Sequence, residues 1–232
     1  MQAEAQVKIK KTKTMEESLN VIRAGVLGSN DGVLTVVGVL FSVGAVTSNP
    51  FTILIAGVAD LFACALSMAS GEYASVSSQA DAEKVVVDLE TQRLVVNRSS
   101  VEADLRDFYL SRGVTAETSQ KIAEALMEKE PLEAILATKY DVQLGHYVSP
   151  WAAAFSSMIC ASLAGALPLL AMILIPGSAG VLLTILATAI ASALIGFASA
   201  KMGHGFPKKA VVRNVIIAML TIMIHYGIGR LF

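Results

Sequence analysis

Five apolar runs limit what this chain can fold into. They cover residues 24–46, 51–73, 150–175, 179–200 and 210–231, and each exceeds the ~20 residues that a helix needs to cross a bilayer. The chain is 54% hydrophobic and only 16% charged, which is too apolar for an ordinary soluble domain. Because a backbone in lipid must satisfy its own hydrogen bonds, the runs predict helices. We therefore expect an all-α membrane protein with five transmembrane helices.

The segment between the second and third runs has a different composition. It holds most of the 19 acidic residues of the chain. Asn97 is expected to break the helix that continues from the second run, whereas Thr115 and Pro131 are residues that start helices. No break follows the second run, so we expect its helix to continue beyond the membrane. The predicted organisation is an N-terminal segment, two spans, an inserted helical domain and three further spans, a 2+3 arrangement: residues 1–23, 24–77, 78–147 and 148–232.

Basic residues predict the orientation. The turns at 47–50 and 176–178 contain no Lys or Arg, whereas the N-terminus and the 201–213 loop are basic. The positive-inside rule then places the N-terminus and the inserted helical domain in the cytosol. Residues 15–23 are expected to form a short amphipathic helix at the membrane surface. The polar start of the chain does not resemble a signal peptide.

Acidic residues inside the apolar runs are the first functional signal. Asp31 and Asp60 lie within spans and Glu72 lies at the cytosolic edge, while Asp60, Cys64, Met68 and Glu72 follow one another at four-residue spacing. A carboxylate near mid-bilayer costs ~3 kcal/mol and therefore indicates function. Carboxylate oxygen beside soft sulfur suits a divalent transition metal. Taken singly, Cys64 and Met68 are more simply explained as packing residues.

The first two spans are expected to form an antiparallel hairpin. Asn30-Asp31-Gly32 has the composition of a turn, but its apolar flanks favour a helix with a buried polar face. On ideal helices Asp31 and Asp60 would differ in height by roughly 9 Å, as successive stations on one path. Two spans cannot enclose a path, so a homodimer with the first spans at its two-fold axis is expected. A buried carboxylate can exchange its proton for a cation, which is the minimal chemistry of a proton-coupled antiporter.

The chain resembles the vacuolar iron transporter family from about residue 17 onward. The matching stretches are 29–32 (SNDG), 67–73 (SMASGEY), 77–83 (SSQADAE), 165–169 (GALPL) and 226–231 (YGIGRL). The resemblance implies a dimer of five-span subunits that exports Fe²⁺, and often Mn²⁺, from the cytosol in exchange for protons. It implies that Asp31 and Met68 line the path, that Asp60 serves proton coupling, and that the metal is substrate with no other cofactor. The membrane would be vacuolar in a eukaryote and the plasma membrane in a prokaryote.

The same resemblance implies that the cytosolic helices collect metal through glutamates and a methionine. Glu90 matches the first glutamate, Glu102 and Asp104 neighbour two others, and Asp141 stands for a fourth. The chain departs from the family pattern at four positions of this domain: Arg93, Arg98, Val101 and Ala137. An arginine in such a site would repel Fe²⁺.

Two alternatives stay open. In the first, the chain has the same fold but carries a different cation. In the second, its cytosolic domain is structural or regulatory and loads no metal. A membrane enzyme is disfavoured because the sequence holds no metalloprotease His-Glu pair and no phosphate loop. His225 is expected to pack within its span rather than to bind metal. The net charge of −1 gives no indication of nucleic-acid binding.

Overall fold

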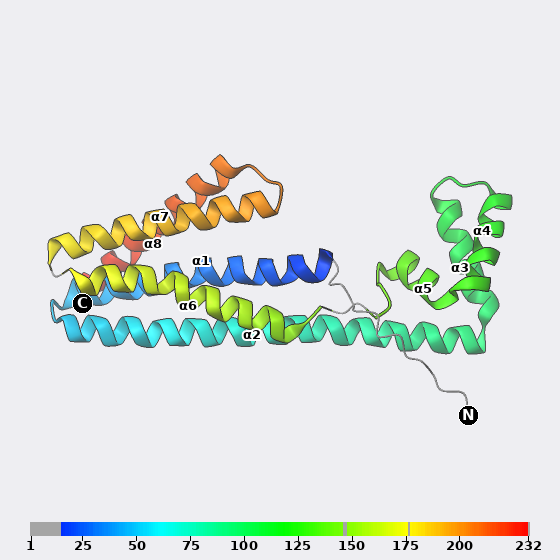
Figure 1. Cartoon of the computed structure of the whole chain (residues 1–232), viewed down its shortest axis with the longest axis horizontal. Helices are drawn as coiled ribbons and strands as arrows, with labels where there is room; N and C mark the ends of the chain where they lie inside the picture. Colours follow the sequence, from blue (N-terminus) through cyan, green and yellow to red (C-terminus); the bar gives the residue numbers. More distant parts are fainter. Residues whose placement is uncertain (1–14, 146–147, 176, 232) are drawn as a thin grey trace, which may run out of the picture. The chain divides into compact units, whose positions relative to one another are not determined.

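The structure, a computed structural model, describes residues 15–145, 148–175 and 177–231. Within these ranges every regular element is helical (Figure 1). In chain order they are α1 (Met15–Val46), α2 (Pro50–Val96), α3 (Arg98–Ser111), α4 (Ala116–Lys129), α5 (Pro131–Ile135), the π-helix η1 (Leu136–Tyr140), α6 (Pro150–Leu174), α7 (Ser178–Met202) and α8 (Pro207–Gly229).

Five of these helices are long and apolar enough to cross a membrane: α1, α2, α6, α7 and α8. This confirms the all-helical fold with five apolar spans. Helix α2 runs without a break for 47 residues, which confirms that the second apolar run continues into polar sequence as one helix.

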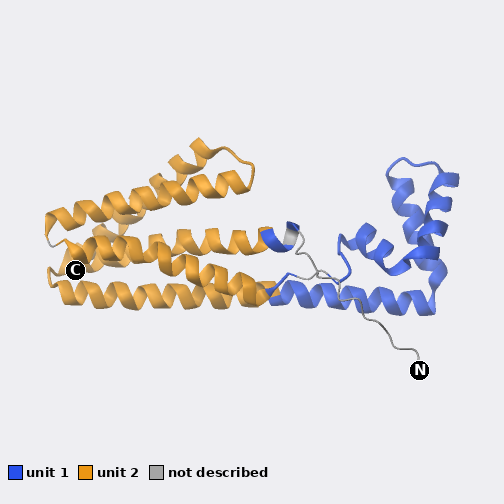
Figure 2. Ribbon diagram, viewed as in Figure 1, with its two compact units in different colours: residues 1–18, 77–149 blue, residues 19–76, 150–232 orange. Residues whose placement is uncertain are grey.

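The chain divides into two compact units (Figure 2). One, called here the helical unit, comprises residues 1–18 and 77–149. The other, called the membrane unit, comprises residues 19–76 and 150–232 and includes the apolar parts of all five long helices.

In the membrane unit, α1 and the first part of α2 form a tight antiparallel hairpin (Figure 1). The turn between them is capped by Asn49, whose Oδ1 accepts a hydrogen bond from the Phe51 backbone N–H at 2.9 Å. Asn30-Asp31-Gly32 lies inside α1, so the helical interpretation of this stretch is confirmed. The polar side chains of the stretch are therefore carried at fixed heights on a continuous helix.

Small residues bring α1 close to α6. A Cβ atom on Gly28 would collide with the carbonyl oxygen of Ser157, and one on Gly32 with that of Ala161. This GxxxG step therefore allows the two backbones to approach directly. Beyond it, Val36 and Leu40 of α1 pack on Leu169 of α6.

The N-terminal prediction needs a correction. Residues 15–23 do not form a separate surface helix, because α1 begins at Met15 and continues through them. The physical reason is the absence of a helix breaker: no proline interrupts the stretch, and the isolated Gly25 weakens a helix without ending it. The basic residues of the N-terminus, numbers 8–13, and His146 lie outside the described residues.

The helical unit is built from short, well-capped helices. Thr115 accepts a hydrogen bond from the Thr118 N–H and Pro131 opens α5, as the sequence predicts. Asn97 breaks α2 as expected, and it also caps α3 by accepting a hydrogen bond from the Ser100 N–H. Its core contains Val101 and Leu105 of α3 with residues of α4 and α5: Ala123, Met127 and Ile135. The π-helix η1 then ends at Asp141, which adopts a left-handed conformation with φ of 55°.

Candidate functional site

Polar side chains of α1 face polar side chains of α2 along the hairpin. Cys64 Sγ lies 3.7 Å from Asp31 Oδ2, where the thiol can donate to the carboxylate. We call the facing polar side chains of the hairpin, which include Asp31 on α1 and Asp60, Cys64, Met68 and Glu72 on α2, the ladder. At one end of the ladder Glu72 pairs with Arg23, with Nη2 and Oε2 3.6 Å apart. Asp31, Cys64 and Glu72 thus share one helix–helix interface.

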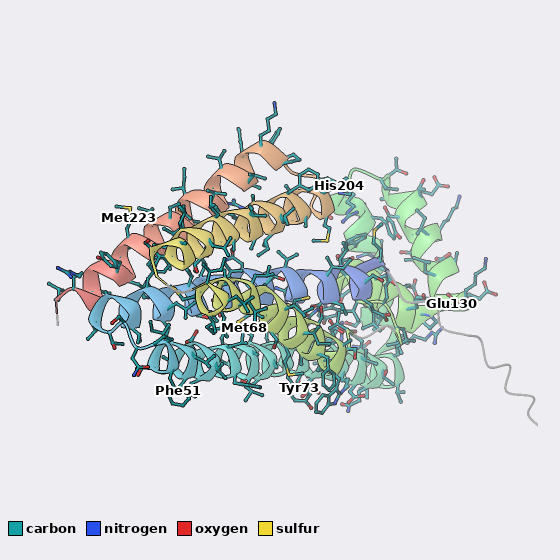
Figure 3. All side chains as sticks on the ribbon, turned by 60° about the vertical axis from the view of Figure 1, so that its left-hand side comes forward. Phe51, Met68, Tyr73, Glu130, His204 and Met223 are labelled. Atoms are coloured by element: carbon teal, nitrogen blue, oxygen red, sulfur yellow. The ribbon has the colours of Figure 1, made fainter. Side chains whose placement is uncertain are left out.

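These contacts fix the register of the hairpin. Asp31 lies opposite Cys64, four residues past Asp60 on α2, so the two carboxylates are about 6 Å apart along the helix axes rather than the ~9 Å expected. By the same register Met68 lies one turn further from Asp60 and opposite residue 27. Figure 3 labels Phe51, Met68 and Tyr73 along α2. Asp60, Cys64, Met68 and Glu72 therefore occupy successive turns of one α2 face.

Asp60 lies where three helices contribute polar groups. The Thr35 hydroxyl of α1 lies beside its carboxylate, and Asp31 and His225 are within electrostatic range. Nevertheless, Thr35 Oγ1 and Asp60 Oδ2 are both shielded from solvent and make no hydrogen bond of normal geometry with any described residue. Buried oxygens left in this way are unusual and indicate a place for a proton, a water or an ion.

His225 of α8 completes this neighbourhood. Its Nδ1 lies 2.9 Å from the Thr221 carbonyl oxygen, which can only accept, so Nδ1 carries a hydrogen and Nε2 is left as the second polar atom. A Cβ on Gly38 would lie 2.8 Å from Nε2, so the glycine lets the imidazole pack against α1. The imidazole is thus hydrogen-bonded and packed against α1, and it lies within electrostatic range of Asp60.

The described residues of the membrane unit do not complete a metal site by themselves. Across the described parts of the chain, no group of three or more His, Cys, Asp or Glu side chains is arranged to hold an ion. Asp31 and Cys64 supply two donor atoms, and Met68 lies one turn away along α2. The remaining coordination would have to come from water, backbone oxygens or another chain.

Glu90, the first predicted metal ligand of the helical unit, is fully buried and already paired. Arg93 Nη1 donates to both carboxylate oxygens at 2.8 and 2.9 Å, and the Tyr140 hydroxyl donates to Oε1 at 2.7 Å. Lys139 Nζ lies 3.6 Å from the same oxygen. Two cations and a phenol therefore surround one carboxylate whose side chain is 0% exposed.

Asp104, another predicted ligand, is held by the same two cations. Its Oδ2 accepts from Lys139 Nζ at 2.8 Å and from Arg93 Nη2 at 3.0 Å. Partial burial acts to raise the pKa of Asp104, but these hydrogen bonds and charges outweigh it and lower the pKa below its ordinary value. The pKa of Lys139 is raised because its ammonium donates a hydrogen bond to Asp104. The pKa of Tyr140 is raised because its hydroxyl donates a hydrogen bond to Glu90. We call Glu90, Arg93, Asp104, Lys139 and Tyr140 the ion-pair network.

The other two predicted ligands of the helical unit lie outside this network. Glu102 accepts a hydrogen bond from Gln120 Nε2 at 2.7 Å. Asp141 follows η1 and donates its backbone N–H to the Leu136 carbonyl. Arg98 does not join Arg93; its guanidinium donates to the Met127 carbonyl. The structure therefore brings together only Glu90 and Asp104 of the four predicted carboxylates, and it does so through cationic side chains.

Sequence reasoning did not single out Arg23 or Thr35. A usable signal was present, because residues whose distances from the tight turn at 47–49 agree to within one residue face each other across an antiparallel hairpin. That rule pairs Arg23 with Glu72 and Thr35 with Asp60. The proximity of His225 to Asp60 had no such signal, since α8 is distant in sequence.

Five apolar helices with carboxylates on an internal interface define a multi-pass membrane protein with a polar interior. Comparison with known proteins is more specific: the sequence model of the VIT family matches residues 22–230. The chain belongs to the VIT family.

Relatives that span most of the chain carry matching names. A vacuolar iron transporter of Acanthamoeba castellanii is 36% identical over 155 residues, which cover 67% of this chain and only 56% of that protein. Vacuolar iron transporter homolog 2 of Oryza sativa subsp. japonica is 29% identical over 212 residues, covering 91% of this chain and 90% of the relative. Vacuolar iron transporter homolog 2.1 of Arabidopsis thaliana is 27% identical over 211 residues, covering 90% and 80%.

Proposed function

We propose that this protein moves a divalent transition metal, Fe²⁺ or Mn²⁺, out of the cytosol in exchange for protons. The observation that carries the proposal is the ladder on the α1–α2 hairpin. Asp31 and Asp60 lie within apolar helices, and among the described residues neither forms an ion pair with Lys or Arg. Carboxylates kept in such a place without a fixed cation are suited to an exchangeable one.

The chemistry of the ladder favours exchange. A buried carboxylate is neutralised either by its own proton or by a bound cation, so loading one releases the other. The Cys64 thiol beside Asp31 and the Met68 thioether one turn away favour a softer divalent ion over Mg²⁺ or Ca²⁺. In this reading Asp31 and Met68 contact the metal and Asp60 carries the proton. The names of the relatives support iron as one such ion.

The orientation and the assembly belong to the same proposal. The distribution of Lys and Arg supports a cytosolic helical unit and N-terminus. A homodimer would bring a second Asp31, Cys64 and Met68 to the path, which suits the incomplete donor set of the single chain. The cytosolic orientation and the homodimer are thus proposed in addition to the multi-pass membrane fold.

Metal uptake into reconstituted vesicles with an imposed pH gradient tests this function. We expect uptake of Fe²⁺ and Mn²⁺ that follows the gradient and collapses with a protonophore, with Co²⁺ and Zn²⁺ measured beside them. Asp60→Asn, which cannot ionise, should lower gradient-driven uptake at least about tenfold. Asp107→Asn, at an exposed ion pair of the helical unit, is the matched control and should stay within about twofold. Unchanged uptake in Asp60→Asn would refute proton coupling through this residue.

For the helical unit, the favoured reading is the second alternative, a domain that loads no metal. Arg93 and Lys139 already neutralise Glu90 and Asp104 at hydrogen-bonding distance. A divalent ion would have to displace two tethered cations from a buried carboxylate. We therefore assign the ion-pair network to the stability of the unit and the transport chemistry to the membrane unit.

A further inference from the structure

An ion pair closes one end of the ladder in the membrane unit. Arg23 Nη2 lies 3.6 Å from Glu72 Oε2; the Glu72 side chain is 6% exposed and that of Arg23 63%. This distance is too long for a hydrogen bond, and Glu72 Oε2 has no hydrogen-bond partner among the described residues. A buried carboxylate oxygen thus faces a cation that holds it loosely.

The position of this pair gives it significance. The hairpin register puts it two turns, about 12 Å, from the Asp31–Cys64 contact. The neighbouring Tyr73 packs against Trp151 with ring centroids 4.7 Å apart, and such aromatic residues collect at the boundary between membrane and water. An ion entering the ladder from this end would meet Glu72 first.

Glu72 depends on the pairing more than Arg23 does. Glu72 is buried and needs a counter-cation, whereas the exposed guanidinium of Arg23 is hydrated whether or not it stays paired. A divalent cation carries twice the charge and can coordinate carboxylate oxygen directly. Replacement of the guanidinium by such an ion therefore keeps Glu72 neutralised, while departure of Arg23 alone does not.

We propose that Arg23 is a tethered cation that occupies Glu72 while the path is empty and that the entering divalent metal displaces it. The inference rests on the proposed transport function and adds an entry gate to it. Competition by Arg23 raises the metal concentration needed to load the path, and it keeps a buried carboxylate from remaining unpaired between transport cycles.

Initial-rate uptake in reconstituted vesicles tests the gate through KM and kcat. Arg23→Gln removes the competitor, so KM for Mn²⁺ should fall about three- to fivefold with kcat changed less than about twofold. Arg23→Met, which keeps the aliphatic stem, should act in the same direction, and Arg23→Lys should stay near the wild-type value. Glu72→Gln should raise KM about tenfold. In the Glu72→Gln background, Arg23→Gln should have no further effect, because its target is gone.

The matched control is Lys84→Gln, which removes a cation from an exposed pair with Asp81 on the same helix. It should leave KM within about twofold. An unchanged or higher KM in both Arg23→Gln and Arg23→Met would overturn the gate, as would additive effects of Arg23→Gln and Glu72→Gln.

Equilibrium binding separates failure of the gate from failure of the proposed transport. Free Mn²⁺ can be followed by its paramagnetic resonance signal during titration of the full chain in detergent. Arg23→Gln should bind Mn²⁺ about three- to fivefold more tightly than wild type even if vesicles show no proton-driven uptake. Absence of uptake in wild type with this shift present would refute antiport and leave the gate standing; absence of the shift would refute the gate.

Discussion

The carboxylates of the two units are treated in opposite ways. In the helical unit, Glu90 is surrounded by a guanidinium, an ammonium and a phenol, and Asp104 shares the two cations. In the membrane unit, Asp31 has a thiol at 3.7 Å, and Asp60 retains a shielded oxygen to which no described residue donates a hydrogen bond. A carboxylate with fixed cations stabilises a fold, whereas one without them is free to take a proton or a metal ion. The contrast supports the proposal that the transport chemistry belongs to the membrane unit, although residues of both units matched family positions in the sequence.

The largest test of this contrast is Asp31→Asn. Asn keeps the shape and can still accept from the Cys64 thiol, but it loses the charge that a divalent ion needs, so metal uptake should fall at least about 100-fold. Uptake into vesicles measures the loss of transport, and a thermal melt of the purified protein checks that the fold is retained. Asp88→Asn, on the exposed face of α2 in the helical unit, should leave uptake within about twofold. Comparable losses in both variants would remove the distinction between the units.

Arg93→Gln tests the opposite role in the helical unit. It leaves Glu90 buried without the guanidinium nitrogen that donates to both of its oxygens, which should destabilise the unit by about 3 kcal/mol. Hydrogen exchange of residues 98–129 in the full chain measures this loss. Arg106→Gln, at the exposed pair with Asp107, should change protection by less than about 0.5 kcal/mol.

The same variant offers a metal readout. Mn²⁺ should not protect the helical unit of the wild type from exchange, because Arg93 and Lys139 occupy the carboxylates. In Arg93→Gln each of Glu90 and Asp104 loses one of its two cations and keeps only Lys139, so Mn²⁺ should bind measurably and protection should rise with its concentration. Strong Mn²⁺ protection in the wild type would show that the network does not exclude metal.

A smaller effect is expected for Cys64→Ser. The hydroxyl can still donate to Asp31, so uptake should persist, but the soft donor is lost. The preference for Co²⁺ and Zn²⁺ over Mn²⁺ should fall about three- to tenfold in competition uptake. Cys160→Ser, at the other free cysteine, is the matched control. Identical metal preferences in both variants would leave Cys64 as a packing residue.

The smallest effect concerns pH. The pKa of Asp104 is lowered, so its contribution to stability is present above its unfolded pKa of ~3.9 and is lost as pH falls through the lower folded value. The pKa of Lys139 is raised, so its contribution is present below ~10.4 and is lost as pH rises through the higher folded value. Exchange protection of the helical unit, corrected for intrinsic rates, should therefore change by less than about 0.5 kcal/mol between pH 5 and 8. A larger change in that window would mean that another group controls the unit.

Local signals in the sequence were sufficient for the helices. Apolar runs predicted the five spans, and the continuous helix through residue 94 followed from the lack of a breaker. Thr115 and Pro131 marked helix starts, and Asn97 marked a helix end, because such signals depend on atoms only a few residues away. The separate surface helix predicted at 15–23 is not found, because nothing in that stretch ends a helix before the rest of α1.

What the sequence determined by itself was the class of protein, its family and the presence of acidic residues in apolar helices. Only the tertiary structure decided which of those acids have partners. The Asp31–Cys64 contact depends on the hairpin register and on the rotation of each helix about its axis. Glu90 meets Tyr140 across 50 positions of sequence, through the fold of α3 to η1. Hydropathy and capping act within a few residues, whereas a side chain acquires its counter-charge from whatever the fold brings within a few ångströms.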